Sequence, residues 1–204
     1  MASTGNLHDG RSRPGGRTER TTERIHEAVL ALLVEGGQSQ VTFQNVARRA
    51  EIERSTLYRR YASRWAMIGE AFAAAYEDEL DFEPTGTFRG DMTCHLARVA
   101  HTLGSPLGRA MLAAGAVARS DPASFGVAGG FWEHRKQRQE PFVREAIGRG
   151  ELDSNVSLEE LFAAADGPLY FRLLIIGQPL DQQWVERTVD NVCRAFCTSS
   201  RSFS

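Results

Sequence analysis

Arginine and hydroxyl side chains follow one another closely between Arg54 and Arg64 of the 204-residue chain. Guanidinium groups pair with phosphate oxygens, and short hydroxyl side chains reach the edges of bases in a DNA groove. No aspartate or glutamate interrupts this segment. Its residue types are therefore those of a surface that binds a nucleic-acid backbone and reads bases.

Apolar residues around this segment have the spacing of two short helices that cross. These residues are Val46, Ala47, Ala50, Ile52 and Leu57. Thr42 is placed to cap the first helix by accepting a hydrogen bond from a backbone N–H. With Leu57 inward, the second helix turns Arg54, Ser55, Thr56, Tyr58, Arg59 and Arg60 outward. We expect a helix-turn-helix over Val41–Arg64; the alternative is an ordinary helical hairpin with an exposed basic face.

The same residues resemble the DNA-binding domain of TetR-family transcriptional regulators. That family has a Thr-capped helix, then Ala-Gly-Val-Ser, Gly-Thr-Leu-Tyr, an aromatic residue and Ser-Lys. This chain has Thr42, Ala50-Glu51-Ile52-Glu53, Ser55-Thr56-Leu57-Tyr58, Tyr61 and Ser63-Arg64. Glu51 replaces the turn glycine, and a non-glycine residue at positive φ costs about 1 kcal/mol. Glu53 at the start of the second helix would repel a phosphate.

The outward positions and the resemblance together predict the DNA contacts. Base edges are assigned to Arg54, Ser55 and Thr56, and phosphates to Thr42, Tyr58, Arg59, Arg60 and Arg64. Gln44 could serve in either role.

Charge is divided unequally along the chain. Residues 1–64 carry 11 arginines and 7 acidic residues, a balance of +4, whereas residues 65–204 carry 13 basic and 19 acidic residues, a balance of −6. A phosphate-binding surface would therefore be confined to the N-terminal part. Residues 1–17 predict a disordered basic arm, in which Arg11, Arg13 and Arg17, with Arg20 beyond it, either follow the DNA or belong to a solvated tail.

Helical periodicity covers the remaining chain and predicts an all-α protein of about nine helices. We expect a three-helix DNA-binding domain over residues 18–64, a linking helix over residues 63–82, and a helical-bundle ligand-binding and dimerisation domain over residues 65–204. Pro141 is expected to kink a helix that ends near Arg149, and Gly167-Pro168 to interrupt another. The run Glu133–Arg138 is expected to be a solvated helix face.

The segment from Phe131 to Phe196 resembles the C-terminal domain of one TetR subgroup, which implies a homodimer and a pocket for an unknown small-molecule effector. Pocket candidates are Met92, His95, Phe125, Phe131 and Trp132, although residues of these types are more often part of a core. Apolar helix faces suggest a dimer interface, with Leu161, Leu169, Val185, Val189, Val192 and Phe196 as candidates.

No catalytic constellation is present in the sequence, and no cofactor or metal site is expected. Cys193 and Cys197 are one helical turn apart, but no histidine has matching spacing. Without a signal peptide or a membrane span, we expect a cytoplasmic protein. The resemblance implies a transcriptional repressor that its effector releases from a palindromic DNA operator. The alternatives are an activator and a helical ligand-binding protein that no longer reads DNA.

Overall fold

The computed structural model describes residues 15–77, 82–118 and 125–198, and every extended element of secondary structure within these ranges is a helix. The N-terminal helices are α1 (Gly15–Gly36), the short 3₁₀ turn η1 (Gln38–Gln40), α2 (Phe43–Ala50), α3 (Arg54–Arg60) and α4 (Arg64–Glu77). The others are α5 (Phe88–Gly104), α6 (Pro106–Ala118), α7 (Phe125–Gly148), α8 (Leu158–Tyr170), the π-helical segment η3 (Phe171–Ile176) and α9 (Gln182–Phe196). The all-α prediction is confirmed.

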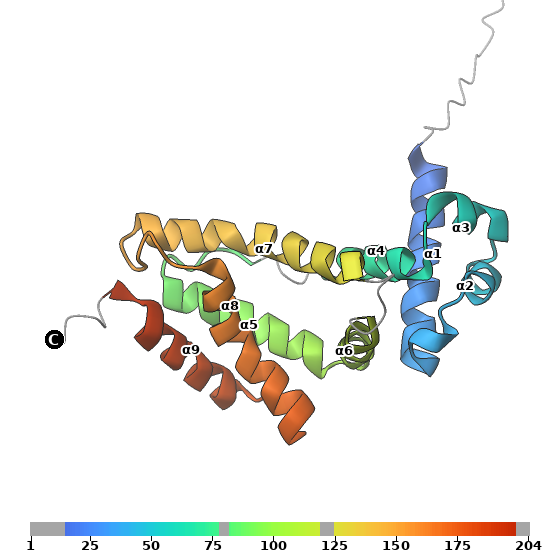
Figure 1. The fold of residues 1–204 in the computed structure, drawn as a ribbon. Coiled ribbons are helices and arrows are strands. Elements are labelled where there is room, and N and C mark those ends of the chain that lie inside the picture. The colour runs from blue at the N-terminus through green and yellow to red at the C-terminus, as the bar shows by residue number, and fades with distance from the viewer. Residues whose placement is uncertain (1–14, 78–81, 119–124, 199–204) are drawn as a thin grey trace, which may run out of the picture.

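The predicted arm over residues 1–17 lies almost wholly outside the described part of the chain, where α1 begins at Gly15. Helices α1 to α3 form one end of the molecule, and α5, α7, α8 and α9 extend from it at the other end (Figure 1). Helices α4 and α6 lie between them.

Two hydrophobic cores divide the molecule at a different place from the predicted boundary at Arg64. The first core joins α1, α2 and α3 through residues such as Ile25, Val46 and Leu57, and it also takes in Trp65 of α4 and Met111 of α6. These two helices cover apolar surface that three short helices leave exposed. The second core lies among α5, α7, α8 and α9. Helix α6 therefore packs against both cores, because Met111 lies in the first core and the neighbouring Leu112 packs against the second.

The interruption expected at Gly167-Pro168 is absent, and Pro141, where a kink was expected, also lies inside a continuous helix. Helix α7 runs through Pro141, and α8 runs through Gly167-Pro168 as far as Tyr170. Pro168 lacks the N–H that would bond to the carbonyl one turn earlier. The hydrogen bonding then changes to the π pattern in η3, and the left-handed Gly177 (φ 72°) ends that segment.

Candidate nucleic-acid interface

The helix-turn-helix is formed by α2 and α3, and its first helix is capped as predicted. Thr42 has extended backbone geometry, and its hydroxyl accepts a hydrogen bond of 3.1 Å from the backbone N–H of Asn45. Val46, Ala47 and Ala50 are buried on the inner face of α2, and Leu57 is fully buried beneath α3. This packing fixes which side of α3 faces solvent.

Glu51 occupies the turn in the left-handed conformation, with φ 51° and ψ 49°. It is the one non-glycine residue with positive φ in the described part of the chain, as its place in the glycine position predicted. Its backbone N–H bonds to the carbonyl of Ala47, and its carboxylate accepts a hydrogen bond of 3.1 Å from Arg24 of α1. The Glu51 side chain is 84% exposed, so this ion pair contributes little stability.

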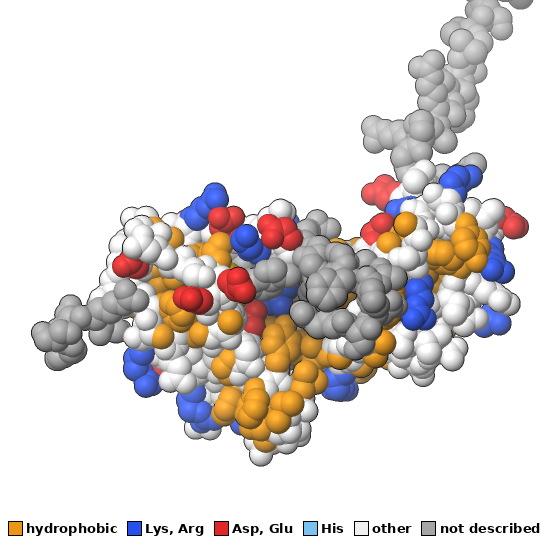
Figure 2. Space-filling model, viewed as in Figure 1, with side chains coloured by type: hydrophobic (Ala, Val, Ile, Leu, Met, Phe, Trp, Pro, Cys, Tyr) orange, Lys and Arg blue, Asp and Glu red, His pale blue; other side chains and the backbone are white. Residues whose placement is uncertain are grey.

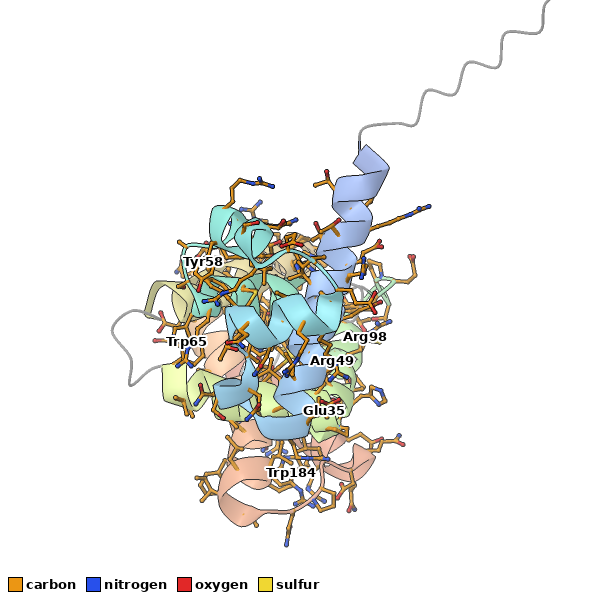
Figure 3. The ribbon with its side chains drawn as sticks, turned by 90° about the vertical axis from the view of Figure 1, so that its right-hand side faces the viewer. Glu35, Arg49, Tyr58, Trp65, Arg98 and Trp184 are labelled. Atoms are coloured by element: carbon orange, nitrogen blue, oxygen red, sulfur yellow. The ribbon has the colours of Figure 1, made fainter. Side chains whose placement is uncertain are left out.

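The exposed face of α3 carries the side chains predicted to meet DNA. Arg54, Ser55, Tyr58 and Arg59 are exposed, and Thr56 is partly buried. The Arg54 guanidinium donates a 2.6 Å hydrogen bond to the Tyr58 hydroxyl, one turn further along the helix. The Tyr58 ring meets Phe43 of α2 edge to face at 4.6 Å, which fixes its direction (Figure 3).

The predicted contacts outside α3 are all at least partly exposed. Gln44 of α2 is exposed, and Arg64, partly buried, lies over the ring of Trp65 at 4.9 Å. A second ion pair holds α2 against α1, because Arg49 donates hydrogen bonds of 2.6 and 2.7 Å to Glu35 (Figure 3). Arginine side chains, with some acidic ones among them, lie over this end of the molecule in Figure 2.

Unlike Arg54, whose hydrogen bond stays within α3, Arg60 bonds to side chains of two other helices. It donates hydrogen bonds to Glu70 of α4, at 2.8 Å, and to Thr22 of α1. Glu70 Oε1 also lies 3.2 Å from His26 Nε2 and 3.3 Å from the Tyr61 hydroxyl. We call this group the Glu70 cluster: Glu70, Arg60, His26, Tyr61 and Thr22. It connects the end of α3 to α1 and to the middle of α4.

Two pKa shifts accompany the Glu70 cluster. Burial raises the pKa of Glu70, but the hydrogen bonds and charges of Arg60 and His26 outweigh it and bring the pKa below its usual range. Burial, together with the negative charge of Glu70, raises the pKa of Tyr61 to about 12. Glu70 was absent from the sequence prediction, because its partners are up to 44 residues away in the chain.

Two of the five pocket candidates have described side chains, and both are buried: Met92 and His95. The side chains of Phe125, Phe131 and Trp132 lie outside the description. His95 Nε2 is 3.0 Å from a carboxylate oxygen of Asp166, whose other oxygen accepts a 2.8 Å hydrogen bond from Arg135.

Arg135 is only 8% exposed, so the expectation that Glu133–Arg138 is a solvated face is wrong at this residue. The aliphatic stem of arginine packs readily, and Asp166 balances its charge. Burial raises the pKa of Asp166, but neighbouring His95 and Arg135 lower it below the usual range.

Five of the six residues proposed for a dimer interface are buried in the protomer's own second core: Leu161, Leu169, Val185, Val189 and Val192. Phe196 is partly buried there. Side chains already enclosed in their own chain have little surface left for a partner. Four of the large apolar side chains that are exposed in the described helices lie instead close together in the sequence of η3: Phe171, Leu174, Ile175 and Ile176. Figure 2 shows an apolar patch at the lowest point of the molecule, where η3 lies in Figure 1.

Other chemistry is not evident in the described helices. No group of three or more His, Cys, Asp or Glu side chains there has the arrangement of a metal site. None of these helices is long and apolar enough to cross a bilayer.

Two family profiles match the chain. Residues 25–71 match the profile described as bacterial regulatory proteins, tetR family, and residues 82–192 match the tetracyclin repressor-like C-terminal domain.

Individual relatives are similar over nearly the whole chain. The HTH-type transcriptional regulator YdeS of Bacillus subtilis is 27% identical over 201 residues, covering 97% of this chain and all of YdeS. The DNA-binding transcriptional repressor TetR of Mycobacteroides abscessus is 26% identical over 182 residues, covering 86% of this chain and 93% of that protein. The crystal structure of the TetR-family regulator SCO0332 superposes with a TM-score of 0.73 at 28% identity, covering 87% of this chain and 99% of that one.

Proposed function

This chain belongs to the TetR family of transcriptional regulators, and from that premise we propose that it is a homodimeric repressor that leaves its DNA operator when a small effector binds. Members of this family bind DNA through their helix-turn-helix domain and dimerise. The observation that carries the proposal is the exposed face of α3, where Arg54, Ser55, Tyr58 and Arg59 lie together without an acidic side chain. Repression is favoured over activation by the similarity to a protein named as a repressor.

In this proposal Arg54, Ser55 and Thr56 meet base edges. Tyr58, Arg59, Arg64 and Thr42 meet phosphates, and Gln44 meets either. The Thr42 hydroxyl is already an acceptor for Asn45 and keeps its own hydrogen for a phosphate oxygen. Arg60 has a different role in this proposal. Its hydrogen bond to Glu70 links α3 to α4.

Two copies of α3 must lie about 34 Å apart to enter successive major grooves on one side of B-DNA. The exposed apolar side chains of η3 supply the self-complementary surface for a second chain. A palindromic operator follows from that two-fold symmetry.

The effector changes DNA affinity through α4. This helix contacts α1 and α7, and the Glu70 cluster ties it to the end of α3. A shift of α4 would therefore move α3 and change the distance between the two recognition helices. The free energy of operator binding that is lost is set by the difference between the effector's binding free energies for the shifted and the DNA-binding conformations.

The proposal is tested in two steps. The purified protein first selects the sequences that it binds from random DNA, and fluorescence anisotropy then measures its affinity for the selected duplex. We expect Arg54→Ala to reduce discrimination between selected and scrambled duplexes by about 1–3 kcal/mol. Arg144→Ala, an exposed arginine on α7, is the matched control and should change nothing. Selection that enriches no sequence would contradict the proposal.

A further inference from the structure

The strongest unexplained feature of the second core is a group of buried polar side chains from three helices. His95 comes from α5, Arg135 and Gln139 come one turn apart from α7, and Asp166 comes from α8. Their exposed fractions are 1%, 8%, 2% and 4%. We call them the buried polar cluster. A buried ion pair of this kind is often no more stabilising than apolar side chains of the same volume, so stability does not account for it.

The hydrogen bonds of the cluster converge on the carboxylate of Asp166. Gln139 Nε2 lies 3.5 Å from His95 Nδ1, and His95 Nε2 lies 3.0 Å from Asp166 Oδ1. A carboxylate only accepts, so His95 Nε2 donates to it, and His95 Nδ1 accepts from the Gln139 amide. Arg135 donates to Asp166 Oδ2 at 2.8 Å and to the Tyr170 hydroxyl at 3.0 Å.

One acceptor is left at the start of this chain of hydrogen bonds. Gln139 Oε1 is buried and has no hydrogen-bond partner in the described structure. A buried carbonyl oxygen without a donor is costly, and native structures rarely keep one without a reason. A ligand O–H or N–H placed against this oxygen would satisfy it.

Charge and neighbouring rings limit the kind of ligand. The single carboxylate of the cluster is already paired with Arg135, so a charged ligand would remain without a counter-charge in a buried place. Aromatic side chains surround the imidazole, with the rings of Phe162 and Phe142 at 5.5 and 6.0 Å from that of His95. Rings in this arrangement pack well against another aromatic ring.

We propose that the buried polar cluster is the polar end of the effector site, and that the effector is an uncharged aromatic molecule whose hydroxyl or N–H group donates a hydrogen bond to Gln139 Oε1. This inference rests on the proposed function and names the chemical class of its effector. In this proposal the ring of the effector packs beside Phe142 and Phe162, and helix α7, which carries Gln139, also contacts α4.

Binding of three hydroxyarenes of increasing size, each beside its methyl ether, tests the inference on the full-length protein. The probes are phenol, 2-naphthol and 4-phenylphenol, measured by calorimetry and by thermal stabilisation. We expect at least one hydroxyarene to bind at least about tenfold more tightly than its ether, because a site that accepts an O–H bond rejects the analogue without one. Gln139→Met should bring that ratio close to one, and Gln137→Met, an exposed glutamine on the same helix, should leave it unchanged.

The inference would be overturned if none of the three hydroxyarenes binds. It would also be overturned if each hydroxyarene and its ether bind with equal affinity, and neither result requires a variant. A preference that survives in folded Gln139→Met would overturn it too. Affinity for the selected duplex without ligand is measured in parallel. If that affinity is present while the hydroxyl preference is absent, only the effector class is wrong; if DNA binding itself is absent, the proposed function fails.

Discussion

Arginines that look equivalent in the sequence have different tasks in the folded protein. Arg54 is exposed and bonded to Tyr58, Arg64 lies over the Trp65 ring, and Arg60 is bound to Glu70. The spacing around Leu57 was enough to predict which of them face outward. Their partners were not predictable, because Glu70 and Thr22 reach Arg60 only through the packing of α1 and α4.

Replacing Arg64 by Ala should weaken binding to every duplex, because its guanidinium is assigned to a phosphate and not to a base. The slope of log K against log salt should fall by about one ion. Anisotropy titrations at several salt concentrations measure this. A loss of affinity confined to the selected sequence would show that Arg64 reads bases.

Replacing Glu70 by Gln should strengthen binding to unrelated duplexes several-fold, because it removes a negative charge near DNA and releases Arg60 towards the phosphates. Glu27→Gln, an exposed carboxylate on α1, is the control for charge alone. If both variants gain affinity equally, then Glu70 does not restrain Arg60.

At pH values above the ordinary aspartate pKa of about 3.9, the carboxylate of Asp166 should stabilise the folded protein. Its native pKa is lowered, so this stabilisation is present at neutral pH and disappears as the pH falls through the native pKa. Asp166→Asn should cost about 3–5 kcal/mol at pH 7, because it leaves Arg135 buried without its counter-charge. Urea unfolding at pH 7, 5 and 3 should show the difference between wild type and variant shrinking only below about pH 5. A difference that is constant with pH would contradict the pairing.

At the scale of elements, long apolar periodicities predicted helices well, and short or irregular segments were missed. The spacing of Val185, Val189 and Val192 predicted α9, whereas the 3₁₀ turn at Gln38–Gln40 and the π-helical η3 were not predicted. Asp166 did leave a signal, because it falls within the apolar stripe of Phe162, Ala165 and Leu169. A polar residue in such a stripe indicates a buried partner, but the sequence does not identify Arg135 as that partner.

Helix α6 should be sensitive at Gly108 and tolerant at Gly115. A Cβ at Gly108 would lie 2.0 Å from the carbonyl oxygen of Thr102, which is backbone and has little room to shift, whereas a Cβ at Gly115 meets nothing within 4 Å. Gly108→Ala should therefore destabilise by about 1–3 kcal/mol. Gly115→Ala should stabilise by up to about 1 kcal/mol through helix propensity. Denaturant unfolding measures the free energy of unfolding of both variants. Equal changes in the two variants would mean that α5 and α6 are not closely packed at Gly108.

At the scale of the whole molecule, α6 packs against both cores, and the Glu70 cluster joins α3 to α1 and α4, so the helix-turn-helix end is connected by direct contacts to the C-terminal helices. The sequence predicted both ends and the linking helix α4. It placed the dimer interface on side chains that fill the protomer's own core, because apolar periodicity marks burial and does not distinguish burial within a chain from burial between chains.

Ile175 is the most exposed of the large apolar side chains, at 72%, and it lies in η3. Ile175→Asp should shift the protein from dimer to monomer, because a charge buried in an apolar interface has no counter-charge. Val34→Asp, at a 46% exposed valine of α1, is the control. Sedimentation velocity at micromolar concentration measures the change, and an unaltered dimer would place the interface elsewhere.

The most direct test of the account is the stoichiometry of the complex between this protein and a duplex obtained by selection, measured by sedimentation at low ionic strength. The account predicts two protomers, or a multiple of two, on each duplex, and loss of sequence preference in Arg54→Ala. A protein that remains a single chain and binds no duplex under these conditions would contradict it.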